Sequence, residues 1–130
     1  MKKLLPTIIF RPMRPDEDGF PKLGASLSTL GVRPNKDIKV AADGTVHPES
    51  GGMSVTPDRW KDVPHPLMPR ELGGEGRHPL FCLLASSLPD SLTARIDRTR
   101  HANVEPVEAC HFEDFNGAVQ ATRLGWRPHE

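Results

Sequence analysis

Proline and glycine are spread along most of this chain and limit the folds that it can adopt. The 130 residues include 14 prolines and 11 glycines, well above a combined average of about 12%. Proline lacks the backbone N–H that a helix needs, so this distribution disfavours an all-helical bundle. We predict an α+β fold in a single small domain of residues 1–130, with short strands in two small sheets and few helices.

The hydrophobic pattern predicts where the regular elements lie. Alternating, β-branched or continuous apolar residues indicate strands, and apolar residues at helical spacing indicate an amphipathic helix. Residues 57–79 are predicted to form a long Pro/Gly-rich loop, and loops of this length in compact domains are often functional. The expected elements are strands over 7–11, 37–40, 80–84, 92–97 and 104–110, one or two helical turns over 25–30, and a helix over 113–124.

The balance of acidic and basic residues argues against nucleic acid as a partner. Seventeen basic residues offset seventeen acidic ones, so the formal net charge is zero. Nucleic-acid binders usually carry a basic excess because phosphate contacts provide most of their affinity, so we do not expect nucleic acid as a partner. Arg95, Asp97, Arg98 and Arg100 are predicted to form the solvated face of a hairpin.

The two cysteines and the N-terminal residues indicate the cellular environment in which the chain is expected to act. Cys82 and Cys110 lack the short ligand spacing of a zinc site, and we predict no metal site and a reduced, cytoplasmic environment. The apolar N-terminal stretch meets residues 11–15 without a small-residue cleavage site, so we predict no secretory signal. No run approaches the roughly 18 apolar residues of a membrane span, and we expect no membrane partner.

The stretch from Asp43 to Val55 combines turn-forming residues with a well-placed hydroxyl group. Asp43-Gly44 predicts a tight turn, and the pair Gly51-Gly52 permits positive φ or a very close backbone approach. Ser54 follows at once, on a segment that favours extended structure. Two interpretations are open at this point: a serine presented to a ligand, or an ordinary turn that leads into a strand.

This stretch resembles the central motif of the type VI secretion effector-two toxin family. In that family an Asp-Gly turn is followed by Pro, a hydroxyl residue, Gly-Gly and Ser-Val, at the spacing found in residues 43–55. Residues 101–106, His-Ala-Asn-Val-Glu-Pro, resemble a second family motif of His, a branched apolar residue and Pro. Phe10-Arg11, at the end of the first predicted strand, matches an aromatic-Arg pair of the family.

The resemblance implies a fold similar to the catalytic core of ADP-ribosyltransferases, with two small sheets that clasp NAD. It implies that Arg11 bonds the ribose or phosphate of NAD, that Ser54 supports the nicotinamide-side ribose, and that the backbone of Gly51 and Gly52 admits the dinucleotide. His101 is implied as a polar partner across the cleft. The implied function is that of a toxin that transfers ADP-ribose or cleaves NAD, with an immunity or antitoxin protein as partner.

Breaking the nicotinamide–ribose bond creates positive charge on the sugar, so a nearby carboxylate is wanted. We predict Ser54, His101 and Glu108 as the catalytic set, with Glu105 and Glu49 as alternative carboxylates. The chain contains no tyrosine and so departs from the ADP-ribosyltransferase pattern in which tyrosines sandwich nicotinamide.

Two other function classes are consistent with the sequence. One is a metal-independent nuclease toxin that uses His and Arg side chains, against which the zero net charge argues. The other is a non-enzymatic interaction module whose contact surface is the loop 57–79. Separately, the alternative interpretation of Arg11 is a strand-end arginine that faces water, and that of His101 is an exposed turn histidine.

Overall fold

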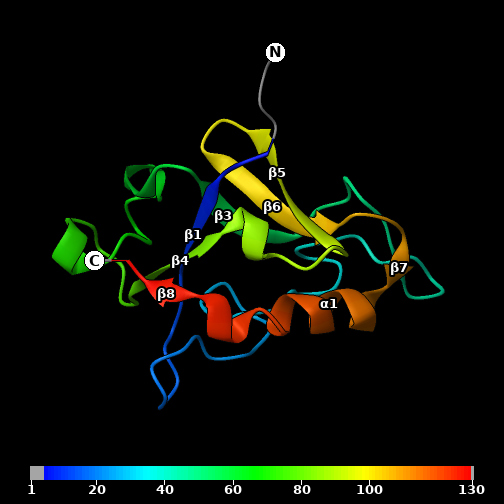
Figure 1. Cartoon of the computed structure of the whole chain (residues 1–130), viewed down its shortest axis with the longest axis horizontal. Helices are drawn as coiled ribbons and strands as arrows, with labels where there is room; N and C mark the ends of the chain where they lie inside the picture. Colours follow the sequence, from blue (N-terminus) through cyan, green and yellow to red (C-terminus); the bar gives the residue numbers. More distant parts are fainter. Residues whose placement is uncertain (1–4, 130) are drawn as a thin grey trace.

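The computed structural model describes residues 5–129; residues 1–4, which begin the apolar N-terminal stretch, and residue 130 lie outside this range. The described part is an α+β fold with a six-stranded antiparallel sheet and a separate two-stranded ribbon (Figure 1). The strands are β1 (Ile8–Pro12), β2 (Thr45–Val46), β3 (Met53–Pro57), β4 (Leu80–Leu84), β5 (Leu92–Arg98), β6 (His101–Pro106), β7 (Cys110–His111) and β8 (Arg127–Pro128). The helical segments are α1 (Phe112–Gln120) and the 3₁₀ turns η1 (Trp60–Asp62), η2 (Arg70–Leu72), η3 (Ala85–Ser87) and η4 (Arg123–Gly125).

The large sheet is narrowly joined in its middle. Its strand order is β5-β6-β3-β1-β4-β8, and β2 pairs with β7 in the ribbon. The central strands β1 and β3 share only the pairs Ile9↔Pro57 and Phe10↔Thr56, whereas β1 and β4 pair over five residues. The sheet therefore consists of two halves, β5-β6-β3 and β1-β4-β8, that meet at a short ladder.

The main core lies between one face of the sheet and helix α1. Phe115 and Val119, four residues apart on α1, face the sheet and are 1% exposed. They belong to the same buried cluster as Ala94 and Val104 of the β5–β6 hairpin and the fully buried Trp126. The helical spacing of these apolar residues explains why α1 forms here, since its apolar face has a sheet to cover.

A second apolar cluster lies on the opposite face, beneath the loop 57–79. Phe10 of β1 and Leu80 of β4 are buried there against Val63 and Met68 of the loop. The His129 ring packs on Phe10 and on Trp60, with ring centroids 5.4 and 5.3 Å apart. Figure 1 accordingly shows the loop, in green, beside the C-terminal end of the chain. The loop is thus a packed cover of the sheet.

Most predicted strands are confirmed. Residues 80–84 form a strand with the predicted bounds, and the strands at 8–12 and 92–98 differ from prediction by one residue. The fifth strand begins earlier than predicted, at His101, and the helix ends at Gln120 before the 3₁₀ turn η4.

Two predicted elements are wrong. Residues 25–30 form bends and a turn rather than a helix, because Ser26, Ser28 and Thr29 bond to one another's side chains and backbone. Residues 37–40 hold only isolated bridges of Ile38 to Pro34 and Gly51. Among residues 5–129, no helix has the length and apolar character needed to cross a membrane.

Candidate functional site

Ser54 and His101 come together on the loop-covered face of the sheet. Their strands are neighbours, and Ser54 lies opposite Asn103. Side chains two residues apart on a strand share a face, so His101 lies on the face of Ser54 and Asn103. The His101 Nε2 atom is 3.2 Å from Ser54 Oγ. The prediction that these residues, 47 positions apart, share a site is therefore consistent with the geometry.

Asp97 completes a hydrogen-bonded chain with these two residues. Its Oδ1 atom is 2.6 Å from His101 Nδ1, and Asn103 Nδ2 donates to its Oδ2 at 3.0 Å. A carboxylate only accepts hydrogen bonds, so Nδ1 donates to Asp97 Oδ1 and the other ring nitrogen, Nε2, faces the Ser54 hydroxyl. The arrangement Asp–His–Ser is the one in which an imidazole can take the proton of a serine.

A β-bulge explains how Asp97 reaches His101. Ile96 pairs with Ala102, but His101 pairs with Arg98, so Asp97 is an extra residue in the β5–β6 ladder. Bulges redirect a side chain and are frequent beside active sites. Asp97 is exposed near the end of β5, as predicted for a solvated hairpin face, but its side chain is 23% exposed and bonded to His101, a contact that was not predicted.

The electrostatics of this pair favour an ionised carboxylate. Burial raises the pKa of Asp97, but the hydrogen bond and charge of His101 outweigh burial and leave that pKa below its usual value. Asp97 is therefore charged at neutral pH and holds the imidazole in one orientation.

Arg11 holds the backbone beneath the site. Its guanidinium donates to the Ser54 carbonyl at 2.8 Å, to the Ser26 carbonyl at 3.0 Å and to the Thr29 carbonyl at 2.9 and 3.3 Å. The residue is 4% exposed, and burial lowers its pKa to about 10. Because four donor contacts are made to the chain itself, Arg11 positions the Ser54 strand against the 24–30 segment.

The site opens into a small pocket between the sheet and the loop. Ser54, His101 and Arg11 all contribute to its lining. The pocket volume is about 80 Å³, several times the 10–15 Å³ that one water requires and well below the roughly 300 Å³ of a pocket that holds a whole ligand. It therefore has room for one small group at a time. Its apolar walls are Phe10, Leu27, Val55, Val63, Pro64 and Leu67.

Gly51 and Gly52 serve contacts within the chain. A Cβ atom on Gly51 would lie 2.2 Å from the Asp37 carbonyl oxygen, and one on Gly52 would lie 2.2 Å from the Val104 carbonyl oxygen. Gly51 also has φ +110°, which L side chains rarely adopt. The close approach predicted for a dinucleotide is made here by neighbouring backbone, and neither glycine lines the pocket of Ser54 and His101.

The structure does not bring Glu108 to this cluster. It is exposed in the bend after β6, which ends at Pro106, and it does not line the pocket of Ser54 and His101. Glu105 does lie on the Ser54 face, 2% exposed, where its Oε1 accepts from Arg95 Nε at 2.9 Å and its Oε2 from the Glu49 backbone N–H at 3.2 Å. Glu49 is exposed and lies beside Glu105 through this backbone contact. Asp97 is thus the carboxylate in direct contact with His101.

The cysteines take no part in this site. Cys82 and Cys110 are both free thiols, and burial raises the pKa of each, with nearby acidic side chains adding to the effect at Cys110. They are therefore protonated at neutral pH and weak nucleophiles. Within the described residues, no three His, Cys, Asp or Glu side chains are arranged to hold a metal ion.

The chain was also compared with known proteins. No protein-family model, curated protein or solved structure matches it. The resemblance to the type VI effector-two family therefore stays a prediction from the motifs, and the function is argued from the geometry of Asp97, His101 and Ser54.

Proposed function

We propose that this chain is a small toxin domain of ADP-ribosyltransferase-like fold that binds NAD as a substrate at Ser54 and His101. It transfers ADP-ribose to a target or cleaves NAD, acts in the cytoplasm, and has an immunity protein as partner. The single observation that carries the proposal is the 3.2 Å contact of Ser54 with His101 in a pocket that Arg11 also lines. These three residues come from the three separate motifs on which the family resemblance rests.

The pocket supports the nicotinamide end of such a substrate. Its apolar walls suit a flat ring, and the Ser54 hydroxyl and His101 imidazole provide polar atoms for a ribose hydroxyl or an amide. Its small volume admits one ring, so the rest of a dinucleotide extends out of it. The division of Arg11 between three carbonyls assigns it to positioning Ser54 rather than to a direct phosphate contact.

The chemistry needs stabilisation of a positively charged sugar. When the C1′–N bond of NAD breaks, nicotinamide leaves with the bonding electron pair, and water or a target nucleophile bonds C1′ and loses a proton. Asp97 carries a negative charge and is hydrogen-bonded to His101, which lies between it and the pocket. His101 can accept the proton that the nucleophile loses. Ser54 and His101 are therefore the proposed catalytic residues, and Asp97 is a positioning residue.

Calorimetric titration with NAD tests this proposal. We expect binding to the wild-type chain and at least tenfold weaker binding by Ser54→Ala and His101→Ala, each of which removes one polar contact. Ser86→Ala and His47→Ala, both at exposed positions, are matched controls and should bind as the wild type does. The absence of binding at millimolar NAD, or equal binding by all four variants, refutes the proposal.

A serine hydrolase is the second candidate function. The observation that favours it is the continuous chain from Asp97 through His101 to the Ser54 hydroxyl, with contacts of 2.6 and 3.2 Å. In this chemistry Ser54 Oγ bonds the carbonyl carbon of an ester while His101 takes its proton and then protonates the leaving alcohol.

A fluorophosphonate probe separates the two candidates. Covalent labelling of Ser54, lost in His101→Ala and in Ser54→Ala, supports the hydrolase. NAD consumption without labelling supports the first proposal. Labelling at another residue rejects the hydrolase assignment.

A further inference from the structure

The small pocket adjoins a larger hollow along the loop 57–79. This hollow has a volume of about 480 Å³ and shares Val63 and Pro64 with the pocket of Ser54 and His101. The two spaces also approach through the chain itself, because Arg100 lines the hollow and His101 lines the pocket. A ligand that fills the pocket and extends past Val63 therefore enters the hollow.

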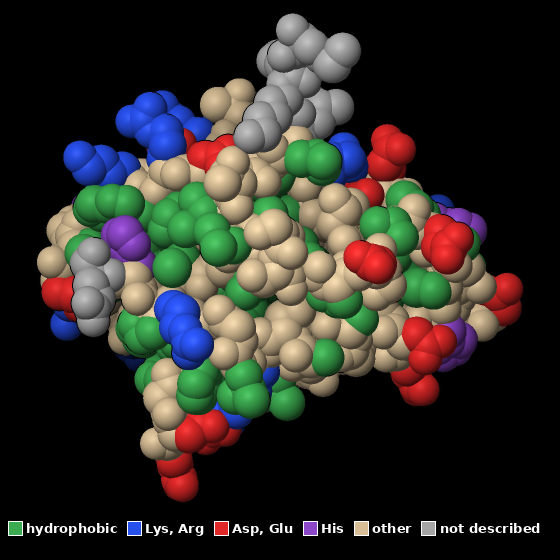
Figure 2. Space-filling view, viewed as in Figure 1, with side chains coloured by type: hydrophobic (Ala, Val, Ile, Leu, Met, Phe, Trp, Pro, Cys, Tyr) green, Lys and Arg blue, Asp and Glu red, His purple; other side chains and the backbone are tan. Residues whose placement is uncertain are grey.

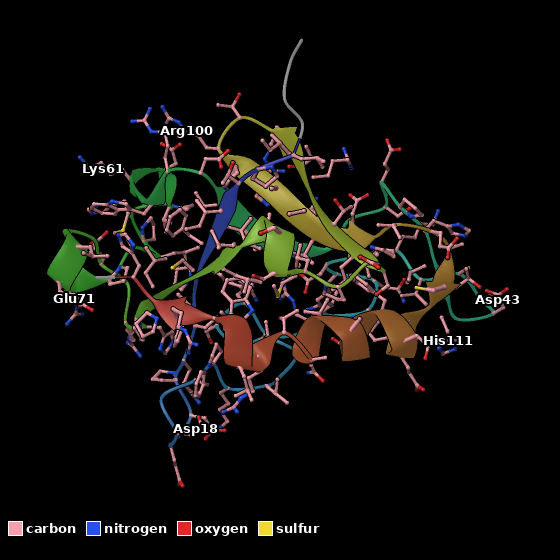
Figure 3. All side chains as sticks on the ribbon, viewed as in Figure 1. Asp18, Asp43, Lys61, Glu71, Arg100 and His111 are labelled. Carbon is pink, nitrogen blue, oxygen red and sulfur yellow. The ribbon has the colours of Figure 1, made fainter. Side chains whose placement is uncertain are left out.

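Two cationic side chains line this hollow. They are Arg100, in the turn between β5 and β6, and Lys61 of η1. Figure 3 places both at the same corner of the molecule, and Figure 2 shows Lys and Arg side chains gathered there beside hydrophobic atoms. We call this space the cationic hollow.

The existing contacts of these two side chains are long. Arg100 Nε is 3.8 Å from Asp62 Oδ1, beyond hydrogen-bond distance, and the Arg100 side chain is 71% exposed. Lys61 Nζ lies 5.7 Å from the centre of the Trp60 ring. Arginine has five donors in a planar fork and lysine has three, so both side chains have donor capacity for an anion that enters the hollow.

We propose that the cationic hollow binds the phosphate groups of the nucleotide whose nicotinamide end lies at Ser54 and His101. This inference rests on the proposed function and assigns the direction in which the ligand leaves the small pocket. Guanidinium and ammonium groups are the usual protein partners of phosphate, and the hollow presents one of each. Its volume lies within the roughly 300–1,000 Å³ of ligand pockets.

The opposite direction is less suited to phosphate. Another hollow, of about 320 Å³, adjoins the small pocket on the side of Pro12, Leu27 and Leu67. It is lined by Arg77 but also by the carboxylate of Glu75. In the cationic hollow, two cations face the single carboxylate of Asp62.

Charge variants test the direction. Arg100→Gln and Lys61→Gln should each weaken binding of NAD and of ADP-ribose about five- to tenfold, because each removes one charged contact to phosphate. Nicotinamide alone should bind them as it binds the wild type. Asp62→Asn should strengthen ADP-ribose binding severalfold, since it removes the negative charge beside the phosphate site.

Arg77→Gln is the matched control, because it removes the same charge from the other hollow. Unchanged NAD affinity in Arg100→Gln and Lys61→Gln, alongside weaker binding by Ser54→Ala, overturns this inference and leaves the proposed function standing. Weaker binding by Arg77→Gln alone likewise overturns the assigned direction.

Inorganic pyrophosphate tests the hollow by itself. If the wild-type chain does not bind NAD, the proposed function fails. Pyrophosphate binding that is lost in Arg100→Gln and Lys61→Gln then still supports the cationic hollow as a phosphate site, and the absence of pyrophosphate binding overturns it.

Discussion

Removing the guanidinium of Arg11 tests whether this buried side chain joins the two halves of the sheet. Arg11 lies at the point where β1 and β3 stop pairing, and its donors bond the carbonyls of Ser54, Ser26 and Thr29. The substitution Arg11→Met keeps an unbranched side chain of similar length but removes every donor. Three buried or half-buried carbonyls then lose a charged partner.

The magnitude follows from two opposing terms. Burial lowers the pKa of Arg11 from its ordinary value to about 10, which corresponds to a cost of about 3 kcal/mol for keeping the charge in the folded protein. This cost applies below about pH 10, where the group is charged in both states, and it declines as the pH rises above the folded pKa. The methionine variant avoids this cost but takes the charged donor from the Ser54 and Thr29 carbonyls, at about 3 kcal/mol each, while the Ser26 carbonyl still accepts from Thr29. We expect a net loss of about 3 kcal/mol.

Urea unfolding at pH 7 measures the effect, with thermal unfolding as a second readout. A loss of this size lowers Tm by about 10 °C in a domain of this length. Arg98→Met, whose side chain is 71% exposed, is the matched control and should change the free energy of unfolding by less than about 0.5 kcal/mol. If Arg11→Met is as stable as the wild type, the assignment of Arg11 as the support between the halves is refuted.

Three further predictions concern glycine, acid stability and the core. Gly51→Ala should destabilise the protein by at least about 2 kcal/mol, since Gly51 has φ +110° and no room for Cβ. Gly117→Ala, with open space in α1, should stabilise it by about 0.5–1 kcal/mol. The two variants should therefore shift Tm in opposite directions, and two shifts of the same sign would contradict the prediction. The lowered pKa of Asp97 makes its ionised form a source of stability that is present above about pH 4 and lost as the pH falls through the folded pKa. The free energy of unfolding in urea should therefore differ between Asp97→Asn and wild type at pH 6 and differ much less at pH 2. An equal difference at both pH values would contradict this role of the Asp97 charge. Trp126→Ala removes a fully buried ring whose Nε1 donates to Thr122 Oγ1 at 3.0 Å. Urea unfolding should show a loss of about 3–5 kcal/mol in the free energy of unfolding. A loss under about 1 kcal/mol would mean that the ring does not stabilise the core.

The sequence identified the strands and two members of the site for clear physical reasons. Runs such as residues 80–84 carry their own periodicity, so the strand there follows from local pattern alone. Ser54 and His101 were found through motif resemblance, and pairing of β3 with β6 brings them within 3.2 Å.

Asp97 could not be found in this way. Its contact with His101 depends on one extra residue in the β5–β6 ladder, and simple alternation gives no sign of such a bulge. Glu108 was predicted as the catalytic carboxylate without knowledge of where β6 begins. Because β6 runs from His101 to Pro106, it carries the chain away from His101 before Glu108 is reached. The glycine pair showed that a close approach is needed but could not show that the neighbour is Val104 of the same chain.

The strand order also has a consequence for how the chain folds. The first strand, β1, lies in the middle of the large sheet, where Ile9 pairs with Pro57 on one side and Leu83 on the other. Neither partner is close in sequence, so the chain must close two long loops before β1 gains its hydrogen bonds. Loop closure is an entropic cost that precedes the gain from pairing, and topologies dominated by such contacts fold on the order of milliseconds to seconds. The local β5–β6 hairpin can form much sooner, and β1 can complete the sheet only after β3 and β4 are available to receive it.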